Sequence, residues 1–209
     1  ERLDNKDALL QGSSYSPYSW HLISRMASAD GHGDVKRYLD DRMPGFAGYE
    51  ANLMPLDIGW YYVYDPEVTA DQFEYILQKC LGFDSSISVQ TNPQNLREHP
   101  EMGPIFDLVS AYSRLRLSGR VSADVRAILR EPGREYRLLR DPARLRRVVY
   151  GPWQQVNDLD GTQNTWTIEP AMAGARLGIQ VRCGPLTRPG PAYASPQAVT
   201  LEDFSSLEP

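Results

Sequence analysis

A nearly unbroken apolar run from residue 53 to residue 63 constrains the fold of this chain more than any other feature. Such a run is typical of a parallel strand that is buried on both faces. It is followed by a helical pattern that Thr69 is placed to cap and Gly82 to end. The apolar residues of this pattern share one helical face: Phe73, Ile76, Leu77, Cys80 and Leu81. Together the two segments predict a strand–helix unit of an α/β fold.

The same alternation of strands and helices extends over the first 131 residues. Helices are expected from residue 33 to Pro44–Gly45, which should end the first of them, and again near residues 105–112 and 121–130. Further strands are expected at residues 8–11, 20–27 and 86–91. The first 131 residues therefore read as three or four βα units.

The pattern changes at Pro132–Gly133. Beyond this point short strand-like runs are separated by turn residues, of which Asp160–Gly161 and Pro189–Gly190 are the strongest. Such spacing is typical of an antiparallel β-sandwich. The sequence predicts two domains, an α/β domain at residues 1–131 and a β-sandwich at residues 132–209.

The first domain has about half the length of a complete (β/α) barrel, which typically needs ~250 residues. Two interpretations are open: a small open α/β domain, or the C-terminal part of a (β/α) TIM-type barrel. The chain begins in the middle of an element and without Met, which favours the partial barrel.

Composition excludes several classes of function. The formal net charge of −5 argues against a general nucleic-acid-binding protein. Apolar windows are too short for a membrane-spanning helix, which needs about 18 or more apolar residues. Three His and two Cys are scattered without the spacing of a metal site, so no metal or other cofactor is expected.

Polar and aromatic side chains gather where two expected strands end. Arg25, Asp30 and His32 accompany the first strand, and Asp57 and Trp60 the second. Because chemistry in parallel α/β folds collects at the carboxyl ends of the strands, these residues predict a site there. Carboxylates beside large rings suit a sugar, since rings stack on sugar faces while carboxylates bind hydroxyl groups and transfer protons.

A family resemblance supports this interpretation. The run from residue 20 to residue 116 resembles the last strands of TIM-barrel glycoside hydrolases, most closely the large uncharacterised glycosidase-like proteins of polysaccharide-degrading bacteria. The motifs that carry it are residues 20–25 (WHLISR), 28–31 (SADG), 55–61 (PLDIGWY), and 74–84 leading into 88–91. The resemblance covers about half the chain. It implies a carbohydrate-active enzyme with a β-sandwich after the barrel, and a secreted or periplasmic location.

Most glycosidases use two carboxyl groups, one on each side of the scissile bond. Asp30 and Asp57 are the candidates for this catalytic pair, although each is equally suited to capping the element that follows it. Their separation would predict the stereochemistry, ~5–5.5 Å for retention and roughly 6.5–9.5 Å for inversion. Another interpretation is that the catalytic acid or base lies in sequence outside this chain.

Five further residues are candidates for binding the substrate. Each also has a structural interpretation: an ion pair for Arg25, a surface position for His32, a cap for Gln90. In a strand, Trp60 and Tyr61 face opposite ways, so at least one of them belongs to the core. The expected substrate-binding residues are Arg25, His32, Trp60, Tyr61 and Gln90.

The sequence therefore predicts a glycoside hydrolase fragment that acts on a poly- or oligosaccharide by carboxylate acid–base catalysis. The alternatives are a non-catalytic carbohydrate-binding or scaffold protein with a degenerate barrel, and a small α/β domain of unrelated function. A half barrel exposes unpaired strand edges. Self-association or docking on a missing N-terminal segment is expected, with no membrane or nucleic-acid partner.

Overall fold

The computed structural model describes residues 10–13, 18, 20–27, 29–31, 34–52, 54–64, 68–140, 143–151, 165–169 and 179. The chain divides into two compact units, Glu1–Thr165 and Trp166–Pro209. In the part of the chain that is described, no helix is sufficiently long and apolar to cross a membrane.

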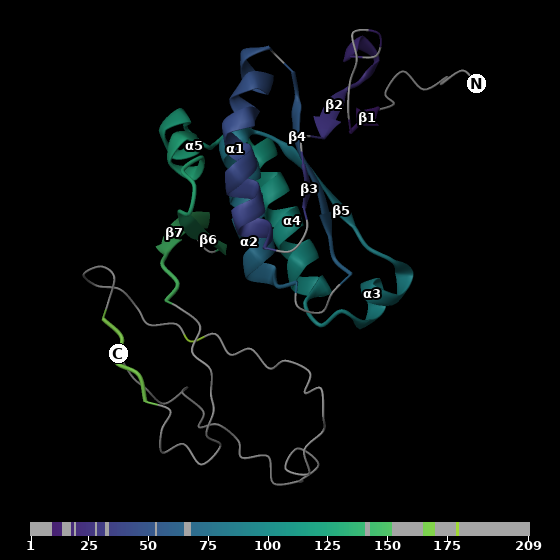
Figure 1. Cartoon of the computed structure of the whole chain (residues 1–209). Helices are drawn as coiled ribbons and strands as arrows, with labels where there is room; N and C mark the ends of the chain where they lie inside the picture. The colour runs from purple at the N-terminus through teal and green to yellow at the C-terminus, as the bar shows by residue number, and fades with distance from the viewer. Residues whose placement is uncertain are drawn as a thin grey trace. The chain divides into compact units, whose positions relative to one another are not determined.

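The first unit is built on a parallel sheet whose strands are arranged in chain order (Figure 1). β1 (Gln11–Gly12) pairs with β2 (Arg25–Ala27), which pairs with β4 (Leu56–Tyr62), and β4 pairs with β5 (Ser86–Gln90). β3 (Asp30–Gly31) continues β2 along the same edge of β4 in an unchanged register. The expected strand at residues 20–27 is shorter than predicted, because a 3₁₀ turn, η1 (Trp20–Leu22), occupies its first part.

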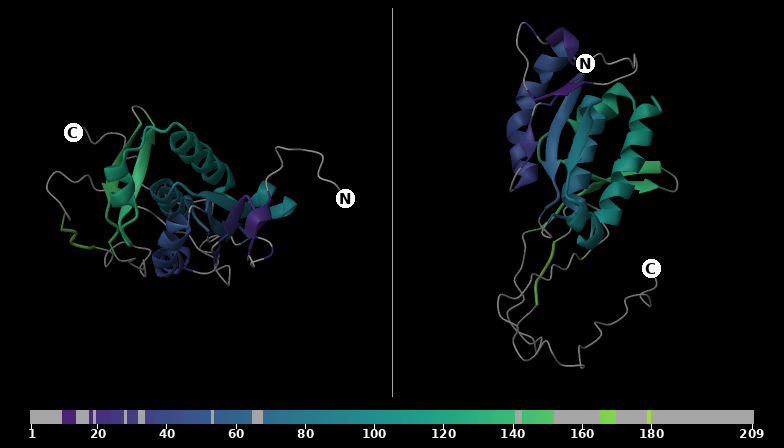
Figure 2. Two further views of the ribbon diagram at one scale, coloured as in Figure 1. Left: turned by 90° about the horizontal axis from the view of Figure 1, so that it is seen from above. Right: turned by 90° about the vertical axis from the view of Figure 1, so that its right-hand side faces the viewer.

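Helices cover one face of this sheet. α1 (Val35–Ala51) joins β3 to β4, and α2 (Ala70–Phe83) joins β4 to β5. α3 (Pro93–Glu98), α4 (Met102–Leu117) and α5 (Ala123–Leu129) follow β5. Because parallel crossovers are right-handed, strands added in one direction place their helices on the same face. α1, α2 and α4 accordingly form one layer against the sheet (Figure 2).

α1 corrects one prediction. Pro44 and Gly45 do not end the helix, which continues to Ala51. Pro44 lacks the N–H that would bond to the carbonyl of Asp40, and its ring crowds that carbonyl. Continuation buries Phe46, whose ring meets that of Phe83 edge-on at 5.2 Å between centroids. This burial outweighs the lost hydrogen bond.

A β-bulge in β4 determines which of its side chains face the helices and which face away from them. Asp57 lies opposite Ser86, but Trp60 lies opposite Ser88, so β4 has one residue more than β5 in this stretch. Gly59 has a φ of 121°, and a Cβ there would lie 2.2 Å from the carbonyl oxygen of Ala29. Only glycine fits this position.

The bulge keeps apolar side chains on the helix side of β4. Ile58 before it and Tyr61 beyond it both pack in the main core. The ring of Tyr61 lies directly over the backbone of Gly31, where an added Cβ would come within 2.4 Å of its Cδ1. Asp57, Trp60 and Tyr62 lie on the opposite face.

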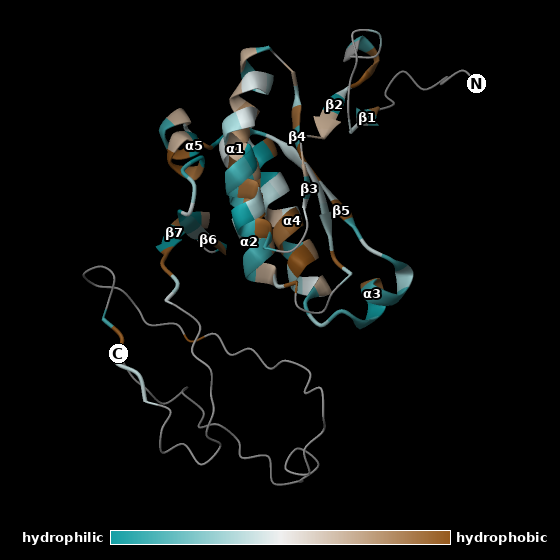
Figure 3. Ribbon diagram, in the orientation of Figure 1, coloured by the Kyte–Doolittle hydropathy of each residue, from teal (hydrophilic) through white to brown (hydrophobic). Residues whose placement is uncertain are grey.

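The hairpin of β6 (Glu135–Arg140) and β7 (Ala143–Val148) packs on α2, away from the sheet (Figure 1). β7 is largely hydrophilic (Figure 3). Three of the hairpin's side chains join a second core with α2, α4 and α5: Tyr136, Leu138 and Leu145. The hairpin belongs to the first compact unit, and the division into domains near residue 132 stays a prediction.

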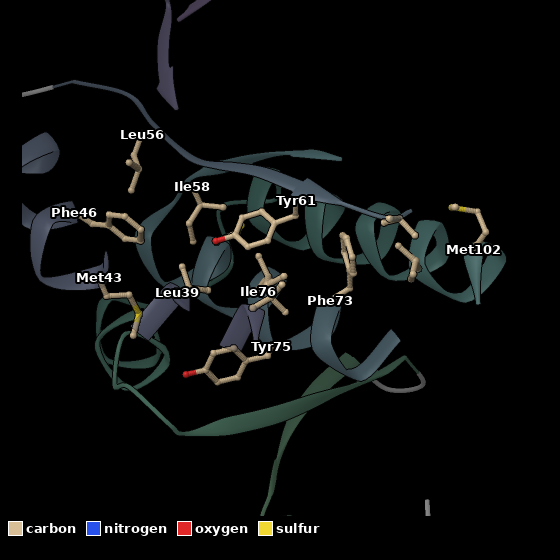
Figure 4. Close-up of a cluster of buried hydrophobic side chains, with 14 residues drawn as sticks. Leu39, Met43, Phe46, Leu56, Ile58, Tyr61, Phe73, Tyr75, Ile76 and Met102 are labelled. Atoms are coloured by element: carbon tan, nitrogen blue, oxygen red, sulfur yellow. The ribbon is translucent and has the colours of Figure 1, made fainter. Parts of the chain in front are cut away.

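The main core lies between the sheet and the helices (Figure 4). Leu39 of α1, Ile58 of β4 and Ile76 of α2 are fully buried there. Cys80 is a free, buried thiol in the same cluster. The apolar spacing that predicted α2 thus marks the face that packs on the sheet.

The predicted β-sandwich falls mostly outside the described residues. Within residues 132–209, the strands that the described part contains are β6 and β7. Residues 165–168, one of the short strand-like runs beyond Pro132–Gly133, have irregular backbone. Mixed α/β architecture is confirmed, and the sandwich stays a prediction.

Candidate functional site

The face of the sheet opposite the helices carries polar and aromatic side chains. Ile87 and Val89 of β5 pack against the core, so the alternate residues of β5 face away from it. Their partners on β4 face the same way, because residues in register share a face of the sheet. This open face contains Asp57, Trp60, Tyr62, Ser86, Ser88 and Gln90.

A hydrogen bond across the open face shows that the sheet is strongly curved. The amide nitrogen Nε2 of Gln11 donates to Oγ of Ser88 over 2.9 Å. Gln11 is in β1 and Ser88 in β5, which are three strand spacings apart. In a flat sheet the two strands would lie roughly 14 Å apart with parallel side chains. The open face is therefore concave.

At the carboxyl end of this face, a carboxylate meets two tyrosines. The hydroxyl of Tyr62 donates to Oδ1 of Asp30, from the neighbouring strand. The ring of Tyr62 stacks on that of Tyr64, with centroids 5.8 Å apart and an interplanar angle of 23°. Asp30 is exposed, as is Tyr64. The hydrogen bond to Asp30, followed by slight desolvation, raises the pKa of Tyr62.

Backbone contacts fix the position of Asp30. Its N–H donates to the hydroxyl of Tyr38 in α1 over 3.1 Å, and Asp30 lies opposite Trp60 in the register. The carboxylate is thus attached to rigid elements on both sides. It can accept hydrogen bonds from sugar hydroxyl groups or exchange a proton with them.

Asp57 lies near the other end of β4 and is buried, with 3% of its surface exposed. Its Oδ1 accepts from the N–H of Gly59 over 3.0 Å, and its Oδ2 from the hydroxyl of Ser86 over 2.5 Å. Desolvation raises the pKa of Asp57, although these hydrogen bonds and the charge of Arg25 oppose the rise. Asp57 holds the bulge in place.

The two carboxylates of the predicted pair are therefore not brought together. Asp30 lies opposite Trp60, three residues beyond Asp57 along β4. Three residues of strand correspond to roughly 10 Å, and the two side chains also differ in exposure. The contacts of Asp57 suit a structural role, and its place in a catalytic pair stays a prediction.

The other predicted site residues are also divided between exposed and buried positions. Gln90 is exposed at the carboxyl end of β5, and Trp60 is partly exposed on the open face. Arg25 lies near Asp57 and donates from Nη1 to the carbonyl of Leu56 over 3.1 Å. Tyr61 is fully buried in the core, so burial prevents it from touching a sugar. His32 lies outside the described residues.

Sequence reasoning missed Tyr64 as a partner of the site. The signal was present, because Trp60, Tyr62 and Tyr64 recur at every second position of a strand and its extension. Gln11 and Ser88 carried no such signal. Their contact depends on the curvature of the sheet, which local pattern does not show.

Among the described residues, no group of His, Cys, Asp and Glu is arranged to hold a metal ion. No family model, curated protein or solved structure matches this chain. The geometry of the open face therefore carries the functional conclusion alone.

Proposed function

We propose that this chain binds a poly- or oligosaccharide at the carboxyl end of its sheet and takes part in hydrolysing it as a glycoside hydrolase. The observation that carries the proposal is the exposed carboxylate of Asp30, bonded to Tyr62, which stacks on Tyr64. Stacked exposed rings offer an apolar surface to a pyranose. A carboxylate beside them suits proton transfer at a glycosidic oxygen.

In this proposal Asp30 is the proton-transfer residue. Tyr62 donates to Oδ1 of Asp30 and orients its carboxylate. A second carboxyl group is needed for most glycosidase mechanisms. Asp65 and Glu67 lie outside the described residues, shortly after β4 in the sequence, and are the residues in this chain that we propose to test for that role.

The concave sheet supports the further proposal that residues 1–131 form the C-terminal part of a (β/α) barrel. Strands in chain order, helices on one face and a side-chain contact across the opposite face are all features of such barrels. A β-sandwich in the remaining chain, and association with another copy or a preceding segment, stay predictions. Sedimentation analysis of the purified chain tests the association directly.

The decisive experiment measures reducing-sugar release from a panel of polysaccharides by the wild type and by Asp30→Asn. We expect the variant to lose ~10²-fold or more of the activity, as for a general acid or base. Asp57→Asn is the matched control, because it makes the same chemical change at a buried position and should retain activity. Equal losses in both variants, or none in Asp30→Asn, would contradict the role of Asp30.

A second candidate function is non-catalytic carbohydrate binding. The burial of Asp57 favours it, because a carboxylate with 3% of its surface exposed is poorly placed to reach a polysaccharide. Under this alternative the panel gives no hydrolysis, while Tyr64→Ala still weakens retention of the protein on the preferred polysaccharide. Hydrolysis that depends on Asp30 excludes it.

A further inference from the structure

The β6–β7 hairpin concentrates positive charge in an acidic chain. The formal net charge of the protein is −5. Residues 135–148 nevertheless contain five arginines, against Glu135 and Asp141 as acidic residues. The arginines are Arg137, Arg140, Arg144, Arg146 and Arg147.

The hairpin directs three of these arginines away from the core. Tyr136, Leu138 and Leu145 occupy the face that packs on α2 and its neighbours. By alternation, Arg137, Arg144 and Arg146 lie on the opposite face. All three are exposed. We call these three side chains the arginine face.

The arginine face contains like charges that repel one another. Arg137 lies directly opposite Arg146 in the antiparallel register. Like charges at directly opposed positions destabilise a strand pair. An anion bound between the two guanidinium groups would remove this repulsion, so the face has the chemistry of an anion-binding surface.

The ion pairs that the hairpin makes with α2 and α4 leave its guanidinium donors accessible. Nε of Arg137 is 3.8 Å from Oε2 of Glu74, and Nη1 of Arg140 is 3.9 Å from Oδ2 of Asp107. Both distances exceed that of a charged hydrogen bond, which is about 2.7–2.9 Å. Each arginine is more than half exposed, at 52% and 55%. Planar guanidinium groups in this state can bind a carboxylate through two parallel bonds.

A groove and an aromatic ring border the arginine face. The groove has a volume of about 380 Å³ and lies between β6 and the first turns of α2 and α4. Its lining includes Leu108, Leu138 and Leu139, so its floor is apolar. Tyr150 is partly exposed beside Arg137, and its hydroxyl oxygen accepts a hydrogen bond from Nη2 of Arg137 over 3.4 Å. A sugar ring can pack on these apolar groups while its acidic substituent meets an arginine.

We propose that the arginine face and the adjacent groove bind an acidic polysaccharide, a polymer whose sugars carry carboxylates. The proposal rests on the proposed function and names its substrate class. Uronate chains carry at most one charge per sugar, with apolar ring faces between charges. Duplex DNA carries one charge per ≈ 1.7 Å, so the acidic residues of the groove, Asp71, Glu74 and Asp107, repel it more strongly than they repel a uronate chain.

The test compares binding of polygalacturonate by the full chain and by Arg144→Gln/Arg146→Gln. The matched control is Arg97→Gln/Arg120→Gln, which removes two exposed charges elsewhere. At one fixed salt concentration, we expect the first variant to bind at least about tenfold more weakly, equivalent to roughly 1.4 kcal/mol. The control should bind as the wild type does. Equal weakening in both variants, or no change in either, would overturn the proposal.

Competing polymers separate the remaining outcomes. Neutral dextran of similar length should not bind, and duplex DNA should bind less tightly than polygalacturonate. Dextran binding as tight as polygalacturonate binding, or tighter binding of DNA, would contradict an acidic-polysaccharide surface. Asp30→Asn should lose hydrolysis but keep polygalacturonate binding. Loss of hydrolysis therefore tests the proposed function, and loss of binding in the hairpin variant tests this inference.

Discussion

The two sides of α2 are attached to the rest of the protein by different chemistry. On the sheet side, Phe73 and Ile76 pack among apolar side chains of β4 and α1. On the hairpin side, buried polar side chains bind the backbone of the hairpin and its preceding turn. Apolar packing there is limited to a smaller second cluster.

The polar attachment includes three side chains of α2. Oε1 of Glu74 accepts from the N–H of Leu138 over 2.7 Å and from the hydroxyl of Tyr112 over 3.2 Å. One helical turn later, Oε1 of Gln78 accepts from the N–H of Tyr136 over 2.8 Å. The buried ammonium of Lys79 donates to the carbonyls of Glu131 and Arg134.

The difference teaches how each attachment fails. Apolar packing is non-directional and tolerates small adjustments. Buried polar attachments depend on individual atoms, because each lost partner leaves a buried donor or acceptor unsatisfied. The sheet side should therefore be most sensitive where the backbone cannot adjust, and the hairpin side at each polar side chain.

The largest effect is expected at the bulge of β4. Gly59→Ala places a Cβ against the carbonyl of Ala29 and forces a residue other than glycine to a φ of 121°. We expect a loss of at least about 3 kcal/mol in the free energy of unfolding, measured by urea titration. Such a change alters the register on which both faces of the sheet depend.

Gly45→Ala is the control for this variant. Gly45 is helical in α1, and an added Cβ meets nothing within 4 Å. Alanine there should raise stability by about 0.5–1 kcal/mol. If the two glycine variants were equally stable, the bulge would not impose the strain described above.

Sequence predicted the apolar side of α2 well. The spacing of Phe73, Ile76 and Cys80 identified the packed face, because burial against a sheet repeats with the helical period. The run from residue 53 to residue 63 predicted β4 for the same reason. The end of α1 was predicted wrongly at Pro44, since local propensity does not include the burial of Phe46.

The polar attachment had no comparable signal. Glu74, Gln78 and Lys79 have the composition of a solvated helix face, and only the fold brings Leu138 and Tyr136 to them. Prediction of the candidate site from the sequence was limited in the same way. Sequence placed Asp30 and Asp57 near strand ends, but their separation depends on the register of β3 with β4.

The second prediction tests the hairpin attachment. Glu74→Ala leaves two buried donors, Leu138 N–H and the Tyr112 hydroxyl, without their acceptor. We expect a loss of about 2–3 kcal/mol in the free energy of unfolding. Glu74→Gln retains an acceptor oxygen and should lose about 1 kcal/mol or less. Similar losses in both variants would show that the charge matters more than the hydrogen bonds.

The third prediction concerns the pH dependence that Lys79 gives to this attachment. Desolvation lowers its pKa to about 8, against the opposing charges of Asp40, Glu135 and Glu131. The unfolded chain therefore binds this proton more tightly between pH 8 and the usual lysine pKa of 10.5. Stability from this group must rise with pH in that window, because the unfolded state binds more protons there.

Lys79→Met removes the titrating group. Between pH 8 and 9.5, the free energy of unfolding of the wild type should rise by about 1 kcal/mol relative to that of Lys79→Met. This figure is below the limit of 1.36 kcal/mol per pH unit. Urea titrations of both proteins at the two pH values measure the difference. A constant difference between them would mean that Lys79 stays charged throughout the range.

The smallest effect is expected at Asp57, the buried carboxylate that is the sheet's counterpart of Glu74. Asn fits the same contacts, because its oxygen accepts from Gly59 and its amide donates to Ser86. Burial raises the pKa of Asp57, so the ionised side chain lowers stability increasingly as pH rises above 3.8. The free energy of unfolding of Asp57→Asn should therefore rise relative to that of the wild type from pH 4 to pH 7, by about 1 kcal/mol or less. A loss above about 2 kcal/mol at pH 7 would show that the ionised carboxylate is required, and that the sheet, like the hairpin, depends on a buried polar group.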